Sequence, residues 1–221
     1  MNFQEIKRAC TVPLKIHWTF VIIPIILITY AGFLSGLVMS LVLAGSILFH
    51  EYSHVLVSQK NNVYVSHVVL MGLGAGAMID VYDIIDRPWK SIKIAIAGPV
   101  SSILLSIFCF IFSIISFYIT GTSFLTKILI YMGIVNIAIA IFNLLPIYPM
   151  DGGRVLNGFL SIKYGSYKAI KISSVITYIL ATLSIVFFAI FNMWFAMVVM
   201  IFLILMARWE KDKLIDILDN K

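Results

Sequence analysis

Six apolar runs dominate the sequence, and each is long enough, or nearly so, to cross a membrane as a helix. They cover about residues 17–36, 37–58, 92–119, 124–145, 172–191 and 193–207. A spanning helix needs about 20 apolar residues, because only a helix satisfies every backbone polar group within one segment where water is absent. Of the 221 residues, 62% are hydrophobic and 12% are charged, which excludes an ordinary soluble domain. The runs predict an all-α polytopic membrane protein with about six transmembrane helices.

The first run follows a basic segment that contains Lys7, Arg8 and Lys15. A cleaved signal peptide is the alternative interpretation of this region. The run is long for such a peptide, however, and it lacks a clear small-residue cleavage site. We therefore expect it to be a membrane helix that is kinked at Pro24.

The basic residues predict how the helices are oriented. With a cytoplasmic N-terminus, six spans place all 16 Lys and Arg residues except Lys127 on the cytoplasmic side. Both termini are then cytoplasmic, and the protein is a multi-pass component of a cell membrane. Because topology accounts for the basic residues, we expect the lipid bilayer and no nucleic acid among the partners.

A short region between the second and third runs breaks the helical pattern. Residues 63–71 are rich in β-branched and apolar side chains, and Gly72, Gly74 and Gly76 follow at alternating positions. This composition predicts a small β-element over about residues 63–80. The edge of such a strand can pair with an extended segment of another protein.

The second run carries the sequence His50-Glu51-Tyr52-Ser53-His54 near its C-terminal end. Ionisable residues are costly at membrane depth, so they are candidates for function by default. Residues four apart share one face of a helix, so His50 and His54 can bind one Zn²⁺ with Glu51 beside them. A catalytic zinc needs a third protein ligand and an open position for water.

The third ligand is expected from the segment that follows the fourth run. Its prolines prevent a regular helix over residues 143–153, and its glycines permit a turn. The predicted topology brings this segment to the same membrane face as His50 and His54, nearer the cytoplasm. Asp151 is therefore the predicted third ligand.

These residues predict metal-assisted hydrolysis of a peptide bond, with one Zn²⁺ per chain. The metal would acidify a water and polarise a carbonyl, while Glu51 takes the water's proton and returns it to the leaving amine. Asn143 is a candidate for hydrogen-bonding the substrate backbone or the oxyanion, with packing between helices as its alternative role. His17 is interpreted as an interfacial or packing histidine, although a gating or ligand role stays open.

The two motifs together resemble the site-2 protease family of intramembrane zinc metalloproteases, which is peptidase M50-like. The motifs are His50-Glu51-x-x-His54 and Asn143-x-x-Pro146-x-x-Pro149-x-Asp151-Gly152-Gly153. Residues 16–20, Asn136 and the close-packing triplet Ala97-Gly98-Pro99 also resemble family positions. The resemblance implies a zinc-holding core of helices over about residues 37–59, 92–119 and 124–146, and cleavage of single-pass membrane proteins in or near the bilayer.

Two positions depart from the family pattern. Tyr52-Ser53 stands where the family often has Leu-Gly, and residues 71–76 lack the Pro and paired glycines that often precede the third helix. The length fits one compact bundle, so we predict a single protease domain over residues 1–221, a minimal form without a PDZ or CBS domain.

Two other functions stay open at this point. A membrane metal transporter is the first, although acidic and His residues are not spread along several spans as an ion path would require. A catalytically inactive relative that binds membrane helices is the second. The substrate, the cleavage position, the gating helices and the oligomeric state are not encoded in any motif.

Overall fold

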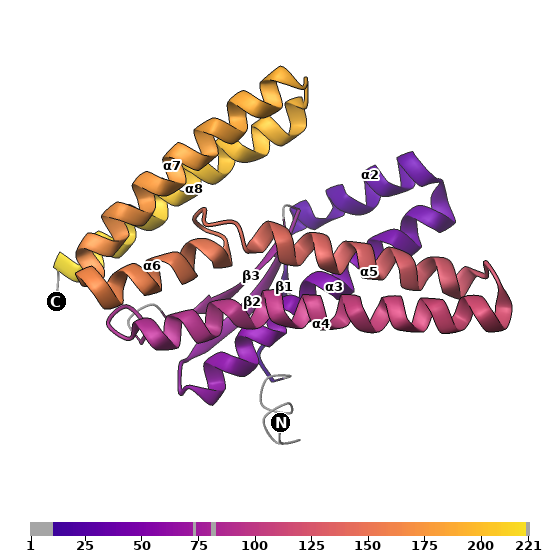
Figure 1. Cartoon of the computed structure of the whole chain (residues 1–221), viewed down its shortest axis with the longest axis horizontal. Helices are drawn as coiled ribbons and strands as arrows, with labels where there is room; N and C mark the ends of the chain where they lie inside the picture. The colour runs from indigo at the N-terminus through magenta and orange to yellow at the C-terminus, as the bar shows by residue number, and fades with distance from the viewer. Residues whose placement is uncertain (1–10, 73, 81–82, 220–221) are drawn as a thin grey trace. The chain divides into compact units, whose positions relative to one another are not determined.

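The computed structural model describes residues 11–72, 74–80 and 83–219. These residues form mainly helices, with one small sheet (Figure 1). The chain divides into two compact units, a first unit of Met1–Asp80 with Ala97–Ile141 and a second unit of Val81–Ile96 with Phe142–Lys221. This division concerns packing only, so a single protease domain over residues 1–221 stays a prediction.

The described elements are, in chain order, β1 (Leu14–Ile16), the 3₁₀-helix η1 (Trp18–Val21), α2 (Ile22–Ala31), α3 (Phe33–Lys60), β2 (Val65–Met71), β3 (Gly74–Ile79), α4 (Pro88–Thr120), α5 (Phe124–Asn143), α6 (Asp151–Tyr164), α7 (Ser166–Ile190) and α8 (Trp194–Asp219).

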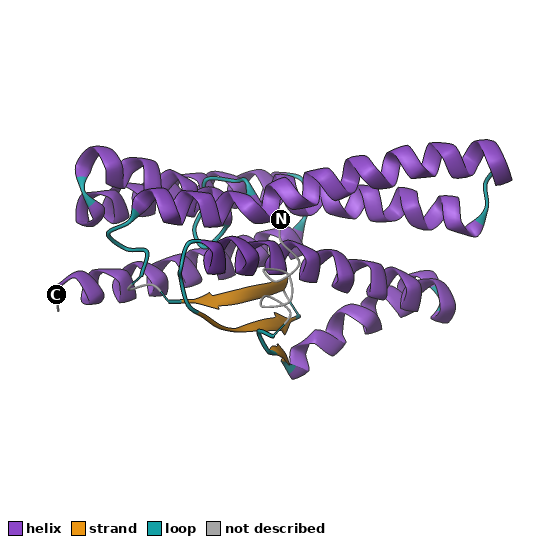
Figure 2. Ribbon diagram, turned by 90° about the horizontal axis from the view of Figure 1, so that it is seen from below, coloured by secondary structure: helices purple, strands orange, loops and turns teal. Residues whose placement is uncertain are grey.

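The sheet belongs to the first unit and has the order β1-β2-β3 (Figure 2). β1 pairs with β2 in parallel, and β2 pairs with β3 as an antiparallel hairpin. Val65 and Val68 of β2 are buried and form a core cluster with Val55 of α3, so the sheet packs on that helix. The predicted β-element is confirmed. β1 was not predicted, because three residues are too few to show strand alternation.

The first predicted helix, over about residues 17–36, has a different form in the structure. A short helical segment, Trp18–Ala31, ends at Gly32, and α3 begins directly afterwards. Gly32 has φ of 81°, a conformation that costs glycine little. Pro24 lies in the first turn of α2 rather than at a kink, because a proline there removes no helical hydrogen bond.

The helix α2 folds back along the start of α3. Gly36 of α3 touches the backbone of Leu27 and Ile28, where any added Cβ would overlap it. Gly32 and Gly36 together therefore make a tight helical hairpin. The sequence predicts this reversal near residue 36 and not at Gly32, because the chain is apolar on both sides of Gly32.

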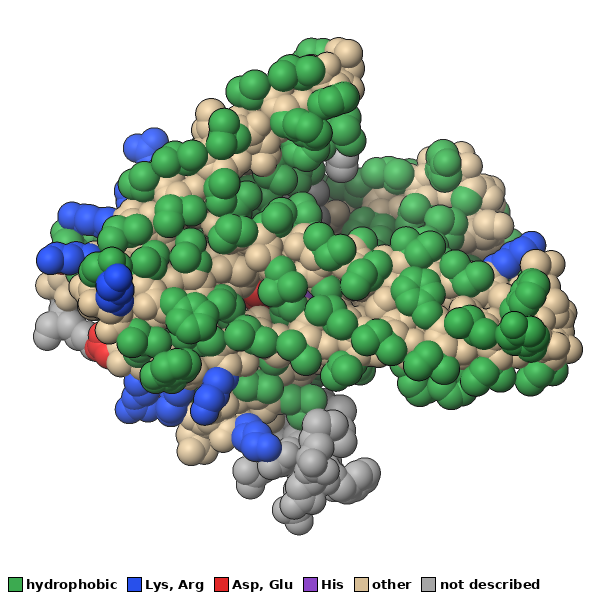
Figure 3. Space-filling model, viewed as in Figure 1, with side chains coloured by type: hydrophobic (Ala, Val, Ile, Leu, Met, Phe, Trp, Pro, Cys, Tyr) green, Lys and Arg blue, Asp and Glu red, His purple; other side chains and the backbone are tan. Residues whose placement is uncertain are grey.

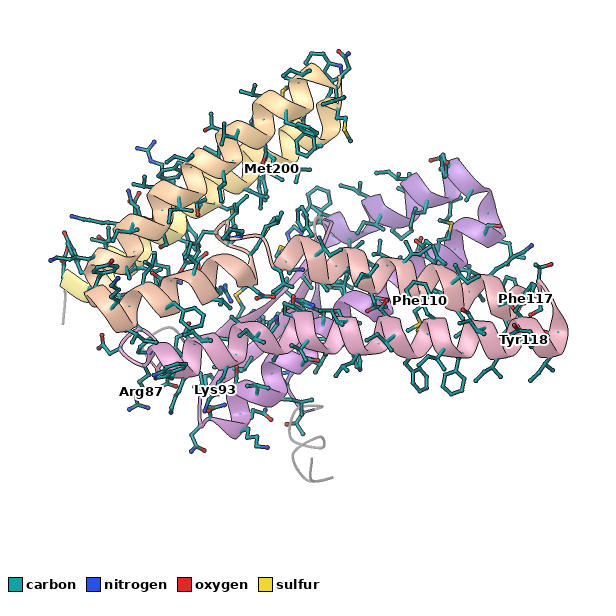
Figure 4. The ribbon with its side chains drawn as sticks, in the orientation of Figure 1. Arg87, Lys93, Phe110, Phe117, Tyr118 and Met200 are labelled. Atoms are coloured by element: carbon teal, nitrogen blue, oxygen red, sulfur yellow. The ribbon has the colours of Figure 1, made fainter. Side chains whose placement is uncertain are left out.

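The helices α4 and α5 form an antiparallel pair in the first unit. Phe110 reaches from α4 toward α5, where its ring lies against Gly133 (Figure 4). Ser106 donates a hydrogen bond of 2.8 Å to the carbonyl of Gly133. The outer faces of both helices carry apolar side chains (Figure 3), as lipid contact requires.

Four helices, α3, α4, α5 and α7, are long and apolar enough to cross a membrane. The chain is therefore a multi-pass membrane protein, as predicted, but the predicted count of six spans is not reached in the described residues. α2 has only 10 residues, and α8 joins an apolar part to the charged residues 208–219.

The second unit contains α6, α7 and α8, with α7 and α8 side by side (Figure 1). α6 lies outside the six apolar runs, because basic residues such as Arg154 and Lys163 interrupt its apolar face in the sequence. That face packs on the start of α4, where Phe159 contacts Trp89 with ring centroids 6.3 Å apart. Gly158 allows this approach, since its missing side chain leaves room for Ile92.

Candidate metal centre

The C-terminal half of α3 gathers three of the residues predicted for the site. His50, Glu51 and His54 are buried, with 2%, 9% and 5% of their surface exposed. Each of the three offers one ligand atom, an imidazole nitrogen or a carboxylate oxygen, and these atoms lie within 4.8 Å of one another. Among the described residues, these three form a group that could hold a metal ion. One turn of helix brings them together, because residues 50 and 54 share a face.

The two imidazoles are spaced as a shared zinc ion requires. Nε2 of His50 and Nε2 of His54 lie 3.2 Å apart. Tetrahedral zinc with Zn–N bonds of about 2.0–2.1 Å would hold two nitrogens roughly 3.3 Å apart. The two residues therefore fit the metal that the sequence predicts.

Ser102 of α4 sets which nitrogen of His50 is available. The Ser102 hydroxyl lies 3.0 Å from Nδ1 of His50, and both residues are buried. A hydrogen bond at one ring nitrogen orients the ring and leaves the other nitrogen for a metal. Sequence reasoning missed Ser102, although Gly98, Ser102 and Ser106 recur every four residues on α4 and mark one small, polar face.

Gly98 of α4 leaves open the space in front of the two imidazoles. A Cβ added to Gly98 would overlap Nε2 of His54 and lie 2.6 Å from Nε2 of His50. The sequence indicated only close packing for Ala97-Gly98-Pro99. The structure gives Gly98 a more specific role, because any side chain there would occupy the position between the ring nitrogens.

Glu51 points to the sheet. Its Oε2 accepts a hydrogen bond of 2.9 Å from the backbone N–H of Ala77 in β3. Ala77 is opposite Val68 of β2, but its N–H is directed to Glu51 and not to that strand. In the described chain, β3 has β2 as its single strand neighbour, so a strand edge borders the carboxylate.

Tyr52, which departs from the family pattern, is accommodated in the first unit. Its hydroxyl donates a hydrogen bond of 3.1 Å to the carbonyl of Val12, and its ring packs on the core between α3 and the sheet. Tyr52 therefore joins α3 to the residues that precede β1.

Asp151 and Asn143 belong to the second unit. Asn143 is the last residue of α5, and Asp151 is the buried first residue of α6. The predicted helix break between them is confirmed. Since His50, Glu51 and His54 are in the first unit, coordination by all three ligands, and a role for Asn143 beside them, stay predictions.

Gly152 and Gly153 hold the start of α6 close to the segment that leads into it. A Cβ at Gly152 would overlap the carbonyls of Leu144 and Leu145, and one at Gly153 would lie 2.7 Å from the backbone nitrogen of Tyr148. The glycines therefore serve close packing, as well as the turn expected from sequence.

Asn136 and His17 make hydrogen bonds that support the fold. Asn136 donates hydrogen bonds to the hydroxyl of Ser46 on α3, at 2.9 Å, and to the carbonyl of Met132. The hydrogen bond to Ser46 links α5 to α3. His17 is exposed and caps η1, with Nδ1 accepting from the backbone N–H of Thr19.

Comparisons with known proteins find relatives that are named zinc metalloproteases. The family model "Peptidase family M50" matches residues 38–124 and 115–187. A curated zinc metalloprotease of Methanocaldococcus jannaschii is 30% identical over 192 residues, which are 85% of this chain and 54% of that relative. The chain thus spans about half the length of this relative.

A solved structure supports the same relationship. The site-2 protease from Methanocaldococcus jannaschii has 30% sequence identity and a TM-score of 0.69, covering 90% of this chain and 91% of that chain. With more than half of its length matched by the family model, the chain belongs to peptidase family M50.

Proposed function

We propose that the protein is an intramembrane zinc metalloendopeptidase that hydrolyses peptide bonds in or near the transmembrane segments of membrane proteins. The observation that supports it best is the pair of Nε2 atoms 3.2 Å apart, beside a buried glutamate, on a helix apolar enough to span a membrane. Burying such ionisable side chains in a membrane costs free energy, so their presence indicates a function.

His50, His54 and Asp151 would hold one zinc ion, which when bound supplies a Lewis acid and an acidified water. The donor set fits this metal, because two imidazoles and a carboxylate leave one position open. The family membership and the name of the zinc metalloprotease relative also support zinc.

Glu51 acts as the general base in this proposal. Its carboxylate takes a proton from the attacking water and returns it to the nitrogen of the leaving amine. Asn143 donates a hydrogen bond to the carbonyl oxygen as negative charge develops there. Burial of Glu51 keeps bulk water away from its carboxylate and strengthens the interactions of that group.

The edge of β3 receives the substrate. A peptide bond inside a helix is shielded by its own turn, so a protease must bind its substrate in an extended form. An extended segment added along β3 would run past Ala77, whose N–H contacts Glu51 at 2.9 Å. The added strand would therefore bring a peptide bond next to the general base.

The expected substrate is a single-pass membrane protein, cleaved from within the bilayer of a cell membrane. The bias of Lys and Arg supports cytoplasmic termini and an active site nearer the cytoplasmic face. No nucleic-acid partner is proposed.

The test is the Glu51→Gln variant of the full chain in lipid vesicles with a panel of single-pass membrane proteins. We expect it to retain zinc, measured by metal analysis, and to lose cleavage by about 10²-fold or more, because the base is gone. Robust proteolysis by this variant would overturn the mechanism. Zinc flux into the vesicles without any cleavage would instead favour a transporter.

A further inference from the structure

The segment before Asp151 is fixed by contacts with other helices. Residues 144–150 lie between α5 and α6 and form neither helix nor strand. Within this segment, the backbone N–H of Tyr148 donates a hydrogen bond of 3.0 Å to the hydroxyl of Thr177 on α7. Thr177 is fully buried and Tyr148 is 6% exposed, so this contact is shielded from water.

The side chain of Tyr148 extends the same contact network. Its hydroxyl is hydrogen-bonded with Asn157 of α6, and burial raises the pKa of Tyr148 above its usual range. The Oδ1 of Asn157 accepts a hydrogen bond of 3.3 Å from Ser173 of α7. The segment, α6 and α7 are thus joined by side chains on both sides of Asp151.

An ion pair joins α6 to α8. Arg154 follows Asp151 by one turn, and its Nη2 lies 3.7 Å from Oε1 of Glu210 on α8. The side chains of Arg154 and Glu210 are 37% and 21% exposed. Burial raises the pKa of Glu210, while the charges of Arg154 and Lys213 lower it. The pair is partly shielded from solvent, so it can contribute more to the stability of the fold than a fully exposed ion pair does.

We propose that α7 and α8 position Asp151 for metal binding, with Thr177, Arg154 and Glu210 as positioning residues. This inference rests on the proposed function, since it requires Asp151 to be a zinc ligand. A ligand must be held within about 0.5 Å of its productive place. Residues 144–150 have no regular hydrogen-bond ladder of their own, so the contacts with α7 and α8 supply that restraint.

The experiment measures zinc affinity of the purified full chain by competition with a chromophoric chelator. Thr177→Val removes the acceptor for Tyr148 N–H at nearly constant volume, and Glu210→Gln removes the charge facing Arg154. We expect each variant to bind zinc about 10–100-fold more weakly, the range for lost contacts that orient a metal ligand. Thermal unfolding of the zinc-free protein identifies any variant that does not fold.

A double-variant comparison separates positioning from general stability. In the Asp151→Ala background, Thr177→Val should cause no further loss of zinc affinity, because it acts through the missing carboxylate. The exchanged pair Arg154→Glu with Glu210→Arg should recover most of the affinity that Glu210→Gln loses. Asp212→Asn is the matched control, since Asp212 pairs with Lys211 on the exposed side of the same helix, 57% exposed.

Three results would overturn the inference. The first is zinc affinity within about twofold of the parent for both Thr177→Val and Glu210→Gln, in a protein whose zinc affinity Asp151→Ala does weaken. The proposed function would stand in that case, and only the positioning role would fail. The second is an equal loss caused by Thr177→Val with and without Asp151, or no recovery by the exchanged pair. The third is unchanged affinity in Asp151→Ala, which would also remove Asp151 from the proposed centre.

Discussion

The two parts of the candidate metal centre are built in different ways. His50, Glu51 and His54 come from two adjacent turns of one helix, so the backbone of α3 alone fixes their spacing. Asp151 follows a segment without regular structure and depends on contacts with residues far away in sequence. The proposed metal site would therefore combine ligands held by local geometry with one held by tertiary structure, and the two kinds should respond differently to mutation.

The largest effect is expected at the helix ligands, from Gly98→Ala. The new methyl group would occupy the place between the two Nε2 atoms, so zinc affinity should fall by at least about 100-fold, beyond the range for orienting contacts. Zinc content of the purified protein measures this. Gly45→Ala on α3, where a Cβ meets open space, is the control and should bind zinc normally.

A gain of zinc affinity or normal zinc content in Gly98→Ala would contradict the geometry described for the two imidazoles. It would mean that the ion binds on another side of the rings.

The next effect concerns the strand edge and is expected from Ala77→Pro. The N–H of Ala77 is not used for pairing with β2, so a proline there removes only the contact with Glu51 and the edge donor. Cleavage should fall about 10-fold or more, the loss of one hydrogen bond to a charged group, while zinc content stays normal. Cleavage of a single-pass reporter and metal analysis of the same sample check this.

Gly76→Pro sharpens the result. Gly76 is the partner of Val69 in the ladder, and its replacement should disturb the hairpin itself. Equal loss of zinc and cleavage in Ala77→Pro would count against a role for this edge in substrate binding.

A smaller effect is expected from Ser102→Ala. Loss of the hydroxyl leaves Nδ1 of His50 without that partner, so zinc should bind about 10-fold more weakly. Ser101→Ala is the matched control, because the Ser101 hydroxyl donates to the carbonyl of Gly98 on its own helix. Competition titration compares the two variants, and equal affinities would remove Ser102 from the centre.

The smallest effect is expected from Ser106→Ala, one turn further along α4. Its hydroxyl donates to the carbonyl of Gly133, so the change should lower the free energy of unfolding by about 0.6–1 kcal/mol. Zinc affinity should not change. Unfolding in detergent measures the loss of stability. Weaker zinc binding in this variant would show that Ser102 and Ser106 act together.

The sequence predicted that three of the candidate site residues lie together. His50, Glu51 and His54 are four residues or fewer apart, so helical periodicity alone places them together, as the structure confirms. The break between Asn143 and Asp151 was also predicted, because prolines act on their own backbone.

Other features depend on contacts between distant residues and were missed. Ser102 and Thr177 are single polar residues in apolar helices, and only the folded chain reveals what they contact. The reversal between the first two helices was placed about four residues too late, because one glycine in an apolar run does not mark where a helix ends. β1 gains its pairing from β2, about 50 residues later.

The most direct test is to locate the ion by anomalous scattering at the zinc edge in crystals of the full chain. We expect one zinc per chain, bonded to Nε2 of His50, Nε2 of His54 and a carboxylate oxygen of Asp151, with Glu51 beside it. An ion bound elsewhere, or an Asp151 carboxylate outside the coordination sphere, would contradict the proposed zinc site.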